Sequence, residues 1–113
     1  MIKIYHNPRC TKSREGLEIL EKSGKDFEIV KYLEDLPTKK ELKATIDLLG
    51  IKAEQLLRKN EKIWQENFKG KTMSDSQIVD AMIAYPKLIE RPIVVNGKRA
   101  VIGRPPQNIL KII

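Results

Sequence analysis

The fold is decided by residues 2–32, which read IKIYHNPRCTKSREGLEILEKSGKDFEIVKY. The opening residues alternate apolar and polar side chains and then run into Asn7-Pro8, which indicates a strand that ends in a turn. Leucines at helical spacing predict a helix that begins near Ser13, and Gly24 supplies the left-handed residue that ends it. The run from Phe27 to Tyr32 predicts a second strand. Because a helix joins the two strands, we expect them to be parallel and to form a βαβ unit.

The chain after this unit is predominantly helical in pattern. Thr38 and Glu41 have the spacing of a capping box, and Ser74 is placed to cap a longer helix that Pro86 ends. Shorter helical patterns lie between them, at 53–57 and 61–68. The sequence therefore predicts a helical insert over about residues 38–85.

The C-terminal third has a different pattern. Apolar runs at 92–95 and 100–102 flank Asn96-Gly97, a strong hairpin signal. A last helix is predicted after Gly103-Arg104-Pro105-Pro106, with apolar residues at 109, 110, 112 and 113. The order βαβ, helical insert, ββα is that of the thioredoxin-like fold. We therefore expect one α/β domain over residues 1–113, with a mixed four-stranded sheet and helices on both faces.

Composition limits the class of protein. Of the 113 residues, 41% are hydrophobic and 33% are charged, and no apolar run approaches the roughly 18 residues that a membrane span needs. The N-terminal residues read as a strand and not as a signal peptide. We expect a soluble, cytoplasmic protein, monomeric and without a membrane partner.

The chain is basic, with 22 Lys and Arg against 15 Asp and Glu and a net charge of +7. Such an excess suits nucleic acid, acidic lipid or a small anion. Aromatic residues make up only 5%, and no basic cluster alternates with Phe or Tyr as in single-strand binders. We therefore expect no nucleic-acid partner, and we interpret the scattered lysines as a solvated surface.

Cys10 is the only cysteine and His6 the only histidine. These two residues cannot form an internal disulfide or a four-ligand zinc site, so no metal is expected. A lone cysteine is by default a small buried hydrophobe. The neighbouring Arg9 and Lys12 argue against that default for Cys10, since charged side chains are rarely buried in a hydrophobic core.

The position of Cys10 also points to chemistry. The loop after the first strand of a βα unit delivers its residues to a helix N-terminus, where backbone N–H groups and the helix dipole favour negative charge. A cysteine in that position, with basic neighbours, is stabilised as a reactive thiolate. His6 either assists the thiolate through charge or a hydrogen bond, or only shapes the turn.

Five motifs resemble the glutaredoxin-coupled arsenate reductase family, in the right order and over essentially the whole chain. The first is the nucleophile loop His6-Asn7-Pro8-Arg9-Cys10-Thr11-Lys12-Ser13-Arg14. The others are Tyr32-Leu33-Glu34, 56–60 (LLRKN), 86–95 (PKLIERPIVV) and Gly103-Arg104-Pro105, the last two forming the C-terminal part of the resemblance.

The resemblance implies a site in which Cys10 attacks arsenate and arginines hold the oxyanion. Arg58, Arg91 and Arg104 match the family's oxyanion-binding positions, and planar guanidinium groups can hold such oxygens bidentately. Ser13 and Arg14 match positions that hold the thiolate, and Pro92 matches the cis-proline that faces the nucleophile loop. Arg58 alone could equally be a solvated helix residue.

The resemblance also implies the co-substrates. With one cysteine the chain cannot resolve its own adduct, so an external thiol is needed, and the family uses glutathione and then glutaredoxin; no bound cofactor is expected. Two alternatives remain open. One is a glutathione-linked thiol oxidoreductase with another substrate. The other is an Spx-like regulator that binds RNA polymerase, although the C-x-x-C pair typical of such regulators has Ser13 at its second position.

Overall fold

The computed structural model describes all 113 residues and divides them into two compact units. The first consists of Met1–Asp35 together with Arg91–Ile113, and the second of Leu36–Glu90. The second unit contains the helical insert predicted at about 38–85 and extends beyond it at both ends. The predicted insert thus lies within the second compact unit.

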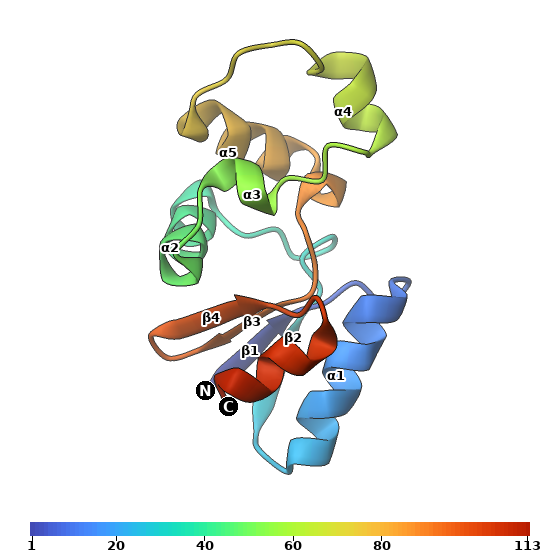
Figure 1. Cartoon of the computed structure of the whole chain (residues 1–113), viewed down its shortest axis with the longest axis vertical. Coiled ribbons are helices and arrows are strands. Elements are labelled where there is room, and N and C mark those ends of the chain that lie inside the picture. The colour runs from blue at the N-terminus through green and yellow to red at the C-terminus, as the bar shows by residue number, and fades with distance from the viewer. The chain divides into compact units, whose positions relative to one another are not determined.

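The first unit holds a four-stranded mixed sheet in the order β2-β1-β3-β4 (Figure 1). The central strand β1 (Ile2–Tyr5) pairs in parallel with β2 (Phe27–Val30) and antiparallel with β3 (Ile93–Asn96). The hairpin partner of β3 is β4 (Arg99–Ile102). This arrangement confirms the predicted mixed sheet and the predicted parallel βαβ unit.

The second strand is shorter than predicted and ends at Val30, two positions before Tyr32. The N–H groups of Glu34 and Asp35 both donate to the carbonyl of Lys31, at 2.9 and 2.8 Å. This tight turn takes the chain out of the sheet. Tyr32 is nevertheless buried, with 1% of its surface exposed.

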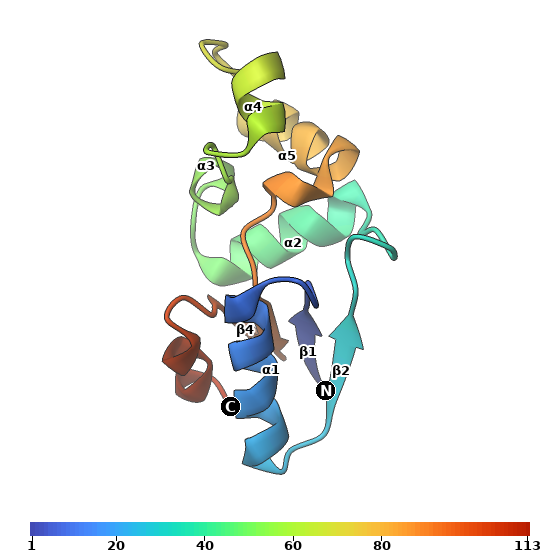
Figure 2. The same ribbon diagram turned by 90° about the vertical axis from the view of Figure 1, so that its right-hand side faces the viewer.

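One face of the sheet carries the core of this unit. Ile2 and Ile4 alternate onto that face, where they meet Val94, Leu20 of α1 (Thr11–Ser23) and Ile109 of the 3₁₀-helix η2 (Pro106–Lys111). Figures 1 and 2 both show α1 and the C-terminal helical segment side by side. Within this unit, α1 and η2 both pack on this face of the sheet.

The C-terminal helix also differs in type from the one predicted. A 3₁₀-helix has about three residues per turn, so residues three apart share a face. Pro106, Ile109 and Ile112 have that spacing: the first two are buried and the third packs against the core. Leu110 falls off this stripe and is 60% exposed.

The predicted hairpin is present, with its turn one residue later than the Asn-Gly signal suggests. Asn96 pairs with Arg99, so it is the last residue of β3 and the two loop residues are Gly97 and Lys98. Gly97 has a φ of 62°, which favours glycine. The side chain of Asn96 instead donates to the carbonyl of Ile112, at 2.6 Å.

The second unit is helical, as predicted. It contains α2 (Lys39–Leu49), α3 (Ala53–Leu56), α4 (Lys62–Asn67), α5 (Asp75–Ala84) and the 3₁₀-helix η1 (Pro86–Leu88). The capping box of Thr38 and Glu41 is formed, and Ser74 caps α5 in the same way with Gln77. Helices α2 and α3 both pack against α5. None of the helices in the structure has the length and apolar character required to cross a membrane.

Candidate active site

The loop from β1 to α1 places Cys10 at the first position before the helix. The N–H of Cys10 donates to the carbonyl of Asn7 at 3.0 Å, which closes a turn. The carbonyl of Cys10 then accepts from the N–H of Arg14 at 3.0 Å, the first bond of the helix. Helix α1 therefore begins at Thr11 and not near Ser13, and Cys10 itself is the N-cap residue.

An N-cap side chain lies where the unpaired N–H groups of the first turn point, which is a favourable position for an anion. The Cys10 side chain makes no capping hydrogen bond with the helix backbone, and the first turn contains no acidic residue. The residue is 9% exposed. The thiol is thus largely shielded from water, at a helix end whose first turn brings no competing carboxylate.

Arg104 contacts the sulfur directly. Its Nη2 lies 3.6 Å from the Sγ of Cys10, and its Nε donates to the carbonyl of Arg91 at 2.8 Å. The backbone segments of the two arginines are also joined, because the N–H of Gly103 donates to the carbonyl of Pro92 at 2.8 Å. The tertiary fold therefore brings one predicted oxyanion-binding residue, Arg104, against the predicted nucleophile.

Arg91 enters this cluster through its backbone carbonyl. Its side chain is partly buried, and the residue that follows, Pro92, is buried. The Arg91–Pro92 peptide bond is cis, which is the isomer that the resemblance assigned to this position. The Arg104–Pro105 bond is also cis, and no sequence feature had pointed to it.

Ser13 and Arg14 contact the loop backbone. The buried hydroxyl of Ser13 accepts a hydrogen bond from the N–H of Asn7 at 3.2 Å. Arg14 donates through Nη1 to the carbonyl of Pro8 at 3.0 Å and through Nη2 to the hydroxyl of Thr11 at 3.2 Å. These contacts fix the shape of the loop that carries Cys10. The role toward the thiolate that the resemblance assigned to both residues stays a prediction.

His6 is buried, with 4% of its surface exposed. Its pKa is lowered from 6.5, chiefly because burial disfavours the charged imidazolium and also because Lys31 and Arg14 are positive; a backbone hydrogen bond with Ser13 opposes the shift. The ring is therefore neutral at pH 7. Of the alternatives that the sequence left open, charge donation to Cys10 is disfavoured, while the hydrogen-bonding and turn-shaping roles remain.

Arg58 belongs to the second unit, after α3. Its N–H donates to the carbonyl of Leu88 at 2.8 Å, and its side chain is only 16% exposed. The guanidinium lies 3.0 Å from a carboxylate oxygen of Glu61 and 3.7 Å from one of Glu90. Arg58 is thus an anchored residue with acidic neighbours and not a solvated helix residue.

Asn7 shapes the loop, a role that was not predicted from the sequence. Its side-chain Oδ1 accepts a hydrogen bond from the N–H of Arg9 at 3.1 Å, while its carbonyl accepts from Cys10. An asparagine that bonds the backbone two residues ahead forms an Asx turn. The Asn7-Pro8 dipeptide, used only as a turn marker, was the signal that could have identified it.

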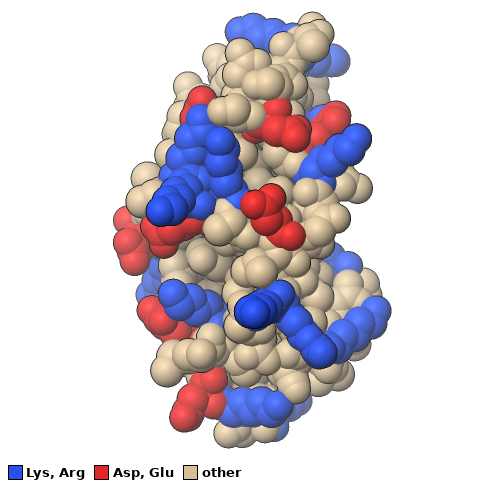
Figure 3. Space-filling view, turned by 90° about the vertical axis from the view of Figure 1, so that its left-hand side faces the viewer, with Lys and Arg blue, Asp and Glu red and all other residues tan.

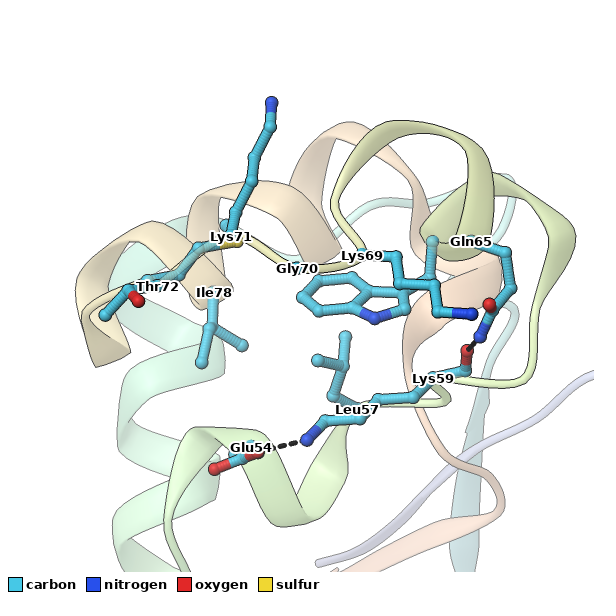
Figure 4. A pocket seen from close by; sticks show the side chains of 11 residues that line it. Glu54, Leu57, Lys59, Gln65, Lys69, Gly70, Lys71, Thr72 and Ile78 are labelled. Carbon is cyan, nitrogen blue, oxygen red and sulfur yellow. Dashed lines mark hydrogen bonds and ion pairs between the residues drawn. The ribbon is translucent and has the colours of Figure 1, made fainter.

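The second unit has a cavity of about 500 Å³ (Figure 4), lined in part by Leu57, Trp64 and Ile78. A site of chemistry requires polar groups that converge on such a space. Here Lys59 is engaged in an ion pair with Glu54, and the side chain of Lys71 points away from the cavity. The structure also contains no group of three or more His, Cys, Asp or Glu side chains that could hold a metal ion. Cys10 is therefore the centre of the candidate site.

Charged side chains of both signs are interspersed on the face drawn in Figure 3. Lys and Arg do not gather there into one continuous patch without Asp or Glu among them. This distribution agrees with the interpretation of the lysines as a solvated surface.

Residues 5–112 match the model of the ArsC family. The chain is 43% identical to the Escherichia coli (strain K12) protein YfgD over 114 residues, covering 99% of this chain and 96% of that protein. It is 39% identical over 110 residues to an arsenate reductase of Neisseria meningitidis serogroup A, covering 96% and 94%. A solved structure, the arsenate reductase from Vibrio cholerae, has a TM-score of 0.94 at 43% identity and covers 99% and 97%. The sheet order and these matches identify the predicted α/β, thioredoxin-like fold.

Proposed function

The chain belongs to the ArsC family, and from this premise we propose that it is an arsenate reductase, an oxidoreductase whose nucleophile is Cys10. The observation that carries the proposal is the position of Cys10 Sγ, at the N-cap of α1 and 3.6 Å from Nη2 of Arg104. The choice of arsenate as the substrate rests on relatives named arsenate reductase, which are 39–40% identical over nearly the whole chain.

Binding is proposed to rest on the groups around Cys10. Arsenate is negatively charged near pH 7, and so is the thiolate that attacks it, so the site must offset the repulsion between two anions. The guanidinium of Arg104 and the N–H groups of the first turn of α1 supply that positive potential. Arg91, joined to Arg104 through its carbonyl, is proposed to bind the oxyanion with it. The resemblance assigns the same role to Arg58.

The proposed reaction transfers two electrons from thiols to arsenic. The Cys10 thiolate attacks arsenic, a sulfur–arsenic bond forms, and one arsenate oxygen leaves as water after protonation. A glutathione thiol then attacks the sulfur of Cys10, and the electron pair of the sulfur–arsenic bond stays on arsenic, which leaves as arsenite. The balance is one arsenate, the Cys10 thiol and one glutathione giving arsenite, a Cys10–glutathione disulfide and water.

The proposed reductants follow from the cysteine count. Cys10 has no cysteine partner in the chain, so an external thiol must regenerate it. Glutathione acts as co-substrate, and glutaredoxin removes it from Cys10 by thiol–disulfide exchange. Cys10 and Arg104 come from the same chain, so the monomer is the proposed working form.

A coupled assay tests this function. Purified protein, arsenate, glutathione and glutaredoxin should give arsenite, and Cys10→Ser should reduce turnover to the background of the reaction without enzyme. Glutathione alone, without glutaredoxin, should support a single turnover and leave Cys10 glutathionylated, as read by mass spectrometry. Turnover that persists in Cys10→Ser would contradict the proposal. Reduction of a glutathione mixed disulfide without any arsenate reduction would point to a different substrate.

A further inference from the structure

Asn108 lies in η2, beyond the proposed site, and its side chain points back to the segment that carries Arg104. Its Nδ2 donates to the carbonyl of Arg104 at 3.1 Å and to the carbonyl of Ile102 at 3.4 Å. Both partners are acceptors, so the amide nitrogen and not the oxygen must face them. One side chain therefore bridges the end of β4 and the backbone of Arg104.

The contacts of Arg104 explain why its backbone needs such an anchor. Arg104 is exposed, and a long, exposed side chain loses rotamer entropy when it is held in one conformation. Its guanidinium nonetheless bonds the carbonyl of Arg91 and reaches Sγ of Cys10 at 3.6 Å. A shift of the Arg104 backbone would move the guanidinium away from the sulfur, because the same side chain serves both contacts.

We propose that Asn108 is a positioning residue, which holds the Arg104 backbone by its two amide hydrogen bonds and so keeps the guanidinium against the Cys10 sulfur. Asn108 touches neither the sulfur nor a bound oxyanion in this role, and acts only through Arg104. The inference rests on the proposed use of Cys10 as a nucleophile, but not on the identity of its substrate.

Two neighbouring residues of η2 provide a matched pair of variants. Asn108→Leu keeps the approximate size of the side chain, removes its donors and adds no charge. Gln107→Leu makes the same chemical change at an exposed position of the same helix whose side chain makes none of these contacts. A general effect of an added leucine on η2 should appear in both variants, and a positioning effect only in the first.

The test is the rate of alkylation of Cys10 by iodoacetamide as a function of pH, which requires neither arsenate nor glutaredoxin. We expect Asn108→Leu to slow alkylation near neutral pH by about threefold to tenfold and to move the midpoint of the pH–rate profile upward, since thiolate is the reacting form. Arg104→Ala should produce a larger change in the same direction, and Gln107→Leu none. Thermal unfolding followed by circular dichroism shows whether each variant is folded under the assay conditions.

The double variant Asn108→Leu/Arg104→Ala decides whether Asn108 acts through Arg104. We expect it to react at the rate of Arg104→Ala alone, because the residue that Asn108 positions is then missing. An unchanged rate in Asn108→Leu, or a double variant slowed by the product of the two single effects, would overturn the inference. Because the readout is alkylation, a failure of arsenate reduction would leave this result separately interpretable.

Discussion

The two compact units differ in what surrounds their positively charged side chains. In the first unit, the guanidinium of Arg104 contacts a sulfur and a backbone carbonyl, and the first turn of α1 beside Cys10 has no acidic residue. In the second unit, Arg58 lies next to Glu61 and Glu90, and Lys59 pairs with Glu54 at the edge of the cavity. Positive groups are thus arranged around a nucleophile in one unit and next to carboxylates in the other.

This difference shows why a cavity alone is weak evidence for a site. The cavity of the second unit has the volume of a small-molecule pocket, but Lys59, one of the three lysines that line it, is already paired with Glu54. The first unit places the candidate nucleophile, a helix N-terminus and a guanidinium within reach of one another. We therefore expect substitutions around Cys10 and Arg104 to change reactivity, and those at the cavity of the second unit to change mainly stability.

The largest effect is expected from Arg104. Arg104→Ala should lower kcat/KM for arsenate reduction about a hundredfold, because removing one preorganised donor from a developing oxyanion costs that much in comparable sites. Arg104→Lys should recover only part of the loss, since an ammonium lacks the planar fork of donors. Lys59→Ala, at the cavity of the second unit, is the control and should leave steady-state kinetics unchanged. Equal losses in Arg104→Ala and Lys59→Ala would contradict the proposal that the site lies around Arg104 and not at the cavity of the second unit.

The next effect is expected from a single added methyl group. A Cβ at Gly103 would lie 2.8 Å from Cγ of Pro92 and 3.2 Å from Cδ1 of Ile109, closer than packed carbon atoms tolerate. Gly103→Ala should therefore lower the free energy of unfolding by about 1–3 kcal/mol, as measured by urea denaturation. It should also slow alkylation of Cys10, because the displaced segment carries Arg104. A destabilised variant with normal Cys10 reactivity would show that this packing does not control the position of Arg104 at the sulfur.

A smaller loss is expected at the start of α5 in the second unit. The hydroxyl of Ser74 accepts a hydrogen bond from the N–H of Gln77, and Oε1 of Gln77 accepts one from the N–H of Ser74. Ser74→Ala should cost about 1 kcal/mol of stability in the same urea assay, and Ser74→Asp should restore most of it. Alkylation of Cys10 should be normal in both variants. A changed alkylation rate would show that the two units are coupled in this respect.

The smallest effect concerns the pH dependence of stability. Because the pKa of His6 is lowered from 6.5 by burial and by nearby cations, the folded protein takes up fewer protons there than the unfolded chain. The contribution of neutral His6 to the free energy of unfolding is complete above the pKa that His6 has in the unfolded chain. It is lost as the pH falls through the lower pKa that His6 has in the folded protein. Urea unfolding from about pH 7 down to about pH 5 should show a steeper loss in wild type than in His6→Gln. Equal slopes would contradict the lowered pKa.

Much of the fold could be predicted because its signals are local. The alternation of Ile2 and Ile4, the capping box at Thr38, the N-cap at Ser74, and the hairpin signal at Asn96-Gly97 each depend on a few consecutive residues. The misses occurred where tertiary context selects among local options. The chain leaves β2 early at a turn around Lys31, and the final helix winds as a 3₁₀-helix that turns Leu110 outward.

The candidate site divides in the same way. Cys10 could be identified from its own neighbours, because a βα loop with basic residues has a defined chemistry. Arg58, Arg91 and Arg104 were identified by resemblance. The only local distinction among them is that Arg91 and Arg104 each precede a proline, whereas Arg58 is followed by Lys59. The resemblance assigned Ser13 and Arg14 to the thiolate, and the structure adds that both residues bond the loop. The bonds from Asn7 to Ser13 and from Arg14 to Pro8 join residues six apart and depend on how the loop closes.

Residue type and spacing along the chain were enough to identify the candidate nucleophile, the lack of a second cysteine among the 113 residues, and the order of strands and helices. Tertiary packing, by contrast, makes Cys10 itself the N-cap, brings Arg104 to its sulfur from 94 positions away, and joins the Arg104 side chain to the carbonyl of Arg91. The contacts of Arg104 join separate parts of the chain. They exist only once packing of the sheet against α1 and η2 has brought the two ends of the first unit together.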